Sequence, residues 1–173
     1  MSGRPENGVL GLFPSFSEVG GVERSGLEAW RAIAGASGGE NHLIRYGLAR
    51  PANASGLADE FGGTVYEARS QVAALLLAAS RGWPVELVVV WHIGMLKLLP
   101  FIRTSGSRTV LFLHGIEAWR KASPVTARLL RRVDLFLTNS DFTWEKFMEI
   151  IRNFLPPGTA RCHSDWEIQW IRS

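Results

Sequence analysis

An apolar run in this chain ends in residues whose side chains could do chemistry. Residues 109–113 have the composition of a buried strand, His114 and Gly115 follow at once, and Glu117 comes two residues later. An imidazole can exchange a proton near neutral pH, and glycine lets the main chain approach a ligand closely. Because α/β proteins bind ligands where the chain leaves the carboxyl edge of the sheet, this run predicts part of a ligand site.

Three more predicted strands end in small or polar residues. In chain order these are Gly20-Gly21 after residues 8–13, His92 after residues 85–91, and Asn139-Ser140 after residues 135–138. In a parallel sheet the carboxyl ends of the strands share one edge, so we expect these residues to gather with His114 and Glu117.

Each of these residues also has a purely structural interpretation. Gly20-Gly21 is either a tight turn or an anion site at which helix amides face a phosphate. His92 is either a histidine at the edge of the core that bonds to a carbonyl or a ligand group, and Asn139-Ser140 is either a helix cap or part of the site. The glycine loop matches neither the dinucleotide-binding nor the ATP-hydrolysing pattern, which argues against both classes.

Strands and helices alternate along the chain and must position these residues. The other expected strand is residues 42–46, and the expected helices are residues 22–34, 71–80, 94–103, 125–133 and 141–154. The helix at 71–80 is apolar almost all round, which predicts burial, and Ser140 is a suitable N-cap for the last helix. The alternation predicts a doubly wound, mainly parallel sheet with helices on both faces.

Length and composition limit the class of protein. The chain has 173 residues, 46% of them hydrophobic, a mean hydropathy of +0.05 and a net charge of +3. We expect one domain over residues 1–155 and a linker-like tail over 156–173. The single cysteine, Cys162, fits a reducing, cytoplasmic compartment, and with His163 it lacks further ligands at metal spacing, so we expect no metal. We expect no nucleic-acid partner and no transmembrane segment, and peripheral membrane contact stays open.

Three segments resemble the amino-terminal half of family 4 glycosyltransferases. They are residues 20–24 (GGVER), 114–120 (HGIEAWR) and 130–140 (LRRVDLFLTNS). The resemblance covers roughly residues 9–151 with order and spacing kept. It implies one Rossmann-like domain of a GT-B fold, in which two such domains face a cleft, and a transferase that moves a sugar from a nucleotide-sugar donor with retention of anomeric configuration. Such enzymes generally work without a bound metal or other cofactor.

The resemblance also implies roles for individual residues. Gly20 and Gly21 would lie near the donor phosphates and the acceptor, and His114 would be the catalytic residue, facing the transferred sugar. Glu117 and Asn139-Ser140 would line the cleft as substrate-binding residues, with His92 on the acceptor side. The protein would stabilise a leaving diphosphate and position the acceptor.

The chain departs from the family in length. Family members are about twice as long, and their second domain holds most donor contacts through a spaced pair of glutamates and a basic pair. We therefore expect the chain to be a fragment, a truncated product or an isolated first domain, inactive without its C-terminal partner. The alternative is a non-catalytic binding or interaction module on the same fold.

The tail has a pattern of its own. Trp166, Ile168 and Trp170 alternate with polar residues, which is typical either of a frayed end or of a strand-like hook. With a hinge at residues 156–158, such a hook could be exchanged between two copies, and we expect a homodimer.

Overall fold

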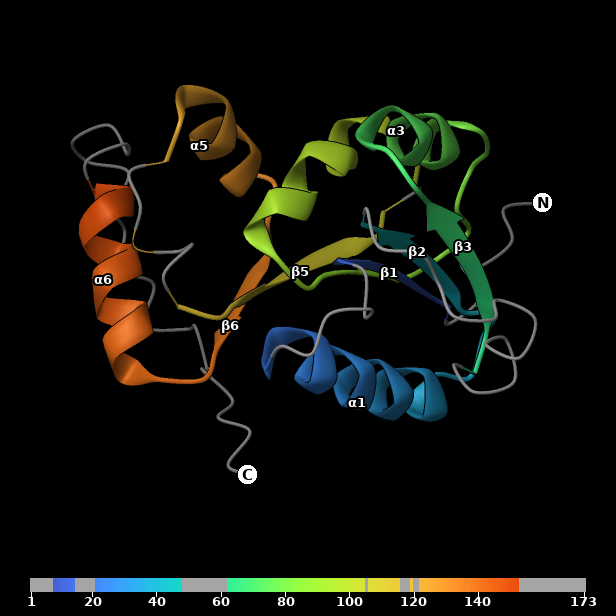
Figure 1. Cartoon of the computed structure of the whole chain (residues 1–173), viewed down its shortest axis with the longest axis horizontal. Coiled ribbons are helices and arrows are strands. Elements are labelled where there is room, and N and C mark those ends of the chain that lie inside the picture. Colours follow the sequence, from blue (N-terminus) through green and yellow to red (C-terminus); the bar gives the residue numbers. More distant parts are fainter. Residues whose placement is uncertain are drawn as a thin grey trace.

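The computed structural model describes residues 8–14, 21–47, 62–104, 106–115, 119 and 122–152. Six strands form one sheet in the order β3-β2-β1-β4-β5-β6, and every neighbouring pair is parallel (Figure 1). The strands are β1 Val9–Pro14, β2 His42–Tyr46, β3 Thr64–Ala68, β4 Leu87–Val90, β5 Arg108–Leu113 and β6 Leu135–Thr138. The α-helices are α1 Gly21–Ala36, α3 Gln71–Ala79, α5 Pro124–Leu130 and α6 Asp141–Arg152, and η2 Ile93–Phe101 is a 3-10 helix.

The strand order reverses direction between β1 and β4. From β1 the chain builds outward to β2 and β3, then returns to β4 and builds the other way to β6. This is the doubly wound order of Rossmann-like folds, and such folds bind ligands beside the carboxyl ends of the two strands at the reversal. The expected fold class, a parallel sheet with helices on both faces, is confirmed.

Each face of the sheet has its own core. On one face α1 packs Trp30 against Phe13 and Leu43, which are fully buried (Figure 1). The other face lies under α3, η2 and α5 and contains the larger cluster. Alternate residues of each strand point to opposite faces, so β1 contributes Leu10 and Leu12 to one core and Val9 and Phe13 to the other.

Two expectations from the sequence need correction. The strand at Thr64–Ala68 was not expected, because its Thr, Tyr and Glu pattern at the sheet edge has neither an apolar run nor a clean alternation. The helix α3 is not buried all round, since only Ala74 and Ala78 are buried while Val72 and Leu76 are 64% and 67% exposed. A nine-residue helix on the outside of a layer has one face to bury, whatever its composition.

The segment expected as a helix at 94–103 is a 3-10 helix with Pro100 inside it. Proline has no N–H to donate, which favours a short, irregular helix over an α-helix. Among the described residues, no helix is both long enough and apolar enough to cross a membrane. Several expectations fall outside the described residues: Gly20, Glu117, most of the connection at 51–63, the hinge at 156–158 and the tail.

Candidate functional site

The strand exits meet at one edge, as the sequence predicts. Val90 of β4 pairs with Leu111 of β5, and Leu113 of β5 pairs with Thr138 of β6, so the exits of β4, β5 and β6 lie side by side. His92, His114, Asn139 and Ser140 therefore share the carboxyl edge. Gly21 opens α1 after β1, whose exit reaches the same edge.

Trp91 connects three of these exits. Its main-chain N–H donates to the carbonyl of Leu12 in β1 at 3.0 Å, and its indole N–H donates to the carbonyl of Val22, in the first turn of α1, at 3.0 Å. Its own carbonyl lies 2.7 Å from Nε2 of His114, which follows β5. Trp91 thus ties the strand reversal, the start of α1 and His114 to one another. The sequence placed this residue at the end of a strand and gave no signal of that role.

The contact with Trp91 fixes the orientation of the His114 ring. A carbonyl oxygen only accepts, so Nε2 carries the proton and donates it to Trp91. In the neutral ring Nδ1 is then an acceptor, which suits a contact with a hydroxyl group. His114 is half-buried. Gly115 beside it has a φ of +147°, which residues other than glycine rarely adopt.

A row of aromatic rings supports the histidine on the α1 face. The Trp91 ring stacks on Phe13 at 5.3 Å and on Phe112 at 4.5 Å between centroids. His114 lies 4.6 Å from the Phe112 ring and 4.8 Å from the Trp91 ring. Phe13 and Trp91 are buried and Phe112 and His114 are half-buried, so the row runs from the core to the surface.

His92 has a structural role in this structure. It is the N-cap of η2, and its Nδ1 accepts from the N–H of Gly94 at 3.0 Å. A Cβ at Gly94 would lie 3.0 Å from that nitrogen, so glycine keeps the cap compact. This geometry favours the structural interpretation of His92, but the partner of Nδ1 is a main-chain N–H and not the expected carbonyl. In the neutral ring the proton then lies on Nε2.

Ser140 is a helix cap, whereas Asn139 is open to a ligand. The Ser140 hydroxyl accepts from the N–H of Thr143 at 3.2 Å, so Ser140 caps α6 as expected. Asn139 is exposed at the same edge. Farther along the edge, after β1, Gly21 is exposed, and a Cβ added there would meet nothing within 4 Å. Packing within the protein therefore leaves open space at Gly21, where a ligand could approach the main chain.

Two further features of the structure were not expected from the sequence. The rings of Trp119 and Phe142 meet edge to face at 5.2 Å while 38% and 52% exposed, one after β5 and one at the start of α6. On β2, the buried Arg45 guanidinium lies 3.1 Å from a carboxylate oxygen of Glu67. Both depend on neighbours that are distant in sequence, so no local pattern predicts them.

No cluster of three or more potential metal ligands occurs in the part of the chain that the structure describes. The described part of the site contains a fixed imidazole, an aromatic row and the open start of a helix.

Comparison of the chain with protein-family models, with curated proteins and with solved structures gives no match. The fold and this edge are therefore the basis for a functional assignment.

Proposed function

We propose that this chain is the acceptor-side domain of a retaining glycosyltransferase that uses a nucleotide-sugar donor. The observation that carries the proposal is the position of His114 at the carboxyl edge, held by Trp91 beside the strand reversal. Doubly wound folds bind their ligands at such a reversal. The proposal also rests on the resemblance of residues 20–24, 114–120 and 130–140 to family 4 glycosyltransferases.

In this proposal the domain binds and orients the substrates and forms no covalent bond to them. The bond from the anomeric carbon to the diphosphate oxygen breaks with its electron pair going to the diphosphate. A bond to the acceptor oxygen forms on the same face, and the proton of the acceptor hydroxyl passes to the departing diphosphate. In this proposal His114 contacts a hydroxyl of the transferred sugar. Gly20 and Gly21 let the amides at the start of α1 approach the departing phosphates, and Glu117 and Asn139 contact the substrates.

The resemblance assigns most donor contacts to a second domain. With the diphosphate left in water, each electrostatic contact is much weaker than in a closed site, so we expect no useful turnover from the 173-residue chain alone. We expect weak donor binding, with a dissociation constant of about 1 mM.

Indole signals of the chain in ¹⁵N NMR test the proposal. Trp91 donates its indole N–H beside the start of α1, whereas Trp83 donates its own to Ala78, away from this edge. Titration with UDP-glucose and GDP-mannose should shift the Trp91 signal, assigned with Trp91→Phe, and leave the Trp83 signal in place. His114→Gln should weaken binding about tenfold, as expected for a lost hydrogen bond to a ligand.

Two results would contradict the proposal. If no nucleotide sugar moves the Trp91 signal, the carboxyl edge is not a donor site. If the purified chain transfers or hydrolyses the donor rapidly, and His114→Ala abolishes this, the domain does not need a second half.

The second candidate is a non-catalytic interaction module on the same fold. The exposed Trp119–Phe142 pair favours it, because exposed aromatic pairs are common in surfaces that bind other proteins. A module of this kind would leave the Trp91 signal unmoved by nucleotide sugars.

A further inference from the structure

A cavity lies at the amino edge of the sheet, opposite the strand exits. Its volume is about 320 Å³, at the lower end of the roughly 300–1,000 Å³ of small-molecule sites. Val88 is the second residue of β4, Thr109 is the second of β5, and Asp134 directly precedes β6. Because parallel strands begin at this edge, the cavity is separate from the edge that carries His114.

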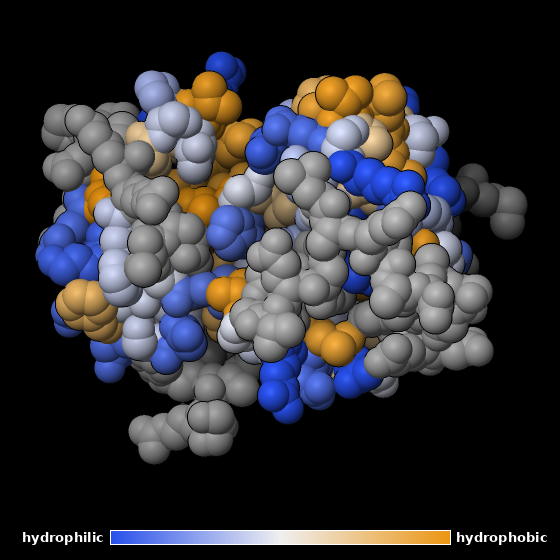
Figure 2. Space-filling model, viewed as in Figure 1, coloured by the Kyte–Doolittle hydropathy of each residue, from blue (hydrophilic) through white to orange (hydrophobic). Residues whose placement is uncertain are grey.

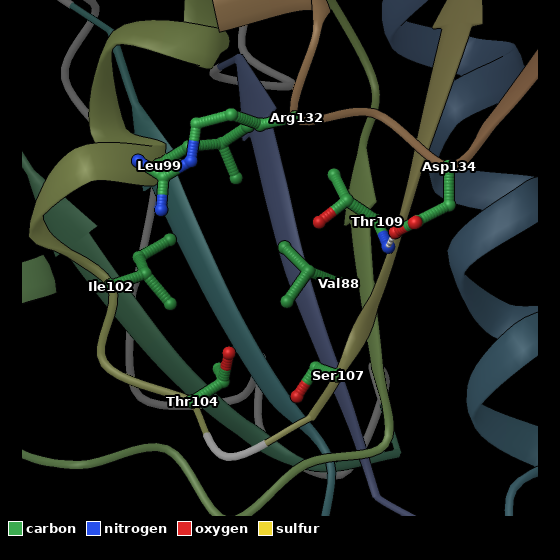
Figure 3. Close-up of a pocket in the computed structure, with 8 residues that line it drawn as sticks. All are labelled: Val88, Leu99, Ile102, Thr104, Ser107, Thr109, Arg132 and Asp134. Carbon is green, nitrogen blue, oxygen red and sulfur yellow. Dashed lines mark hydrogen bonds between the residues drawn. The ribbon is translucent and has the colours of Figure 1, made fainter.

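The floor of the cavity is apolar and its wall carries hydroxyl groups. Val88, Leu99 and Ile102 are 2%, 5% and 8% exposed and form the floor. Figure 3 shows the hydroxyls of Thr104 and Ser107 at the end away from the charged residues. The Ser107 hydroxyl donates to the carbonyl of Val85, so its oxygen remains an acceptor for a bound molecule.

Two opposite charges line the other end of the cavity from different sides. Figure 3 shows Arg132 extended across this end toward Leu99. Within the described residues, the Arg132 guanidinium makes no hydrogen bond or ion pair. Asp134 is fixed differently, because its carboxylate accepts from the N–H of Thr109 at 2.6 Å while its own N–H donates to the Thr109 carbonyl at 2.8 Å.

We propose that this cavity binds a small zwitterion of the size of a free amino acid. Its carboxylate would pair with Arg132, because a planar guanidinium can donate two parallel hydrogen bonds to a carboxylate, one to each oxygen. Its ammonium would donate to Asp134, which is held in place by Thr109 and keeps further acceptor capacity. The carbon chain would lie on the floor, with a polar end toward Thr104 and Ser107. This site is independent of the function proposed for the carboxyl edge.

The amide signal of Thr109 in ¹H–¹⁵N NMR spectra reports binding, because this N–H is bonded to Asp134. The probes are L-glutamine, L-serine and L-leucine, each at up to about 10 mM, where a site of about 1 mM affinity is mostly occupied. Glutaramic acid lacks the α-ammonium of glutamine, 4-aminobutanamide lacks its α-carboxylate, and inorganic phosphate tests Arg132 alone. We expect at least one amino acid to shift the signal and both one-charge analogues of glutamine to bind about tenfold more weakly than glutamine.

Variants test whether the charges of Arg132 and Asp134 contribute to binding of the amino acid. Arg132→Gln and Asp134→Asn should each weaken amino-acid binding about tenfold, and Asp134→Asn keeps an acceptor for the Thr109 N–H. Arg128→Gln is the matched control, since Arg128 is exposed on α5 and outside the cavity. The proposal is overturned if no amino acid shifts the signal. It is equally overturned if glutaramic acid or phosphate binds as well as the amino acid, or if Arg128→Gln weakens binding as much as Arg132→Gln.

Discussion

At the scale of single residues, the decisive side chain of the candidate site is one that carries no chemistry itself. Trp91 holds the first turn of α1 through its indole and the His114 ring through its carbonyl. Position, rather than reactivity, gives this residue its importance, because a histidine acts on a ligand only when its ring is held in the correct orientation. His114 and Gly115 stood out in the sequence because their types suggest chemistry, whereas the role of Trp91 depends on the register of three parallel strands.

A second histidine of the sheet, His42 in β2, is buried. Its ring is 5.3 Å from Trp83, edge to face, and its Nδ1 has no hydrogen-bond partner among the described residues. Burial lowers the pKa of His42 from its ordinary 6.5, while nearby Glu40 raises it and Arg81 lowers it further. The unfolded chain therefore takes up a proton near 6.5 that the folded protein resists.

We predict that the free energy of unfolding falls as pH drops through 6.5, and that part of this fall disappears in His42→Leu. The sign follows because the unfolded state binds more protons in this range, so stability is present above 6.5 and is lost below it. Urea unfolding at about pH 7.5 and about pH 5.5 measures the change, in a range chosen to lie above most carboxyl pKa values. An identical loss of stability in the protein and in His42→Leu would contradict the assignment to this residue.

At the scale of elements, α1 approaches the sheet closely because β1 carries a glycine under it. A Cβ at Gly11 would lie 2.6 Å from Cζ3 of Trp30 and 2.9 Å from Cδ1 of Leu43, and both residues are fully buried. Trp30 in turn meets Phe13 edge to face at 5.7 Å. The packing that sets α1 against β1, and so sets Gly21 near the site edge, therefore depends on a missing side chain.

We predict that Gly11→Ala lowers the free energy of unfolding by about 1–3 kcal/mol, the usual cost of an extra methyl group in a packed core. Gly35→Ala is the control, because Gly35 lies in α1 but is exposed, and a Cβ there would meet nothing within 4 Å. The control substitution should be neutral or stabilise the protein by up to about 1 kcal/mol. Chemical denaturation measures both. Equal effects of the two substitutions would show that the contact with Trp30 does not limit the packing.

The elements also show where sequence patterns stop being informative. The segments 42–46 and 135–138 were predicted with the bounds that β2 and β6 have, because apolar runs bounded by polar residues define them. β3 was missed because an edge strand is only partly buried, and the cavity at the amino edge was missed because three separate segments form it. The gathering of His92, His114 and Ser140 at one edge could be predicted from parallel topology alone, whereas the cap formed by His92 depends on the backbone geometry after β4.

At the scale of the whole molecule, the two edges of the sheet carry different sets of side chains. The carboxyl edge carries a fixed histidine and an aromatic row, and the amino edge carries an arginine and an aspartate over an apolar floor. β4 and β5 run through both sites, since Val88 and Thr109 line the cavity while Trp91 and His114 follow the opposite ends of the same strands. An effect of one ligand on the binding of the other would therefore have a direct route through two paired strands.

The outer side of α3 is the surface on which we expect the chain to associate with itself. Val72 and Leu76 lie one turn apart and are 64% and 67% exposed, and Figure 2 shows hydrophobic residues gathered over this helix. We predict that Val72→Gln combined with Leu76→Gln lowers the weight-average mass in concentrated solution, because it removes the apolar surface that water disfavours. Glutamine forms helices well, so the unfolding free energy should change by less than about 0.5 kcal/mol.

Val125→Gln on α5, where the side chain is 69% exposed but isolated from α3, is the control for a general gain in solubility. Light scattering over a concentration series measures all three proteins. If the mass is unchanged in the double variant, or falls as much with Val125→Gln, α3 is not the contact surface.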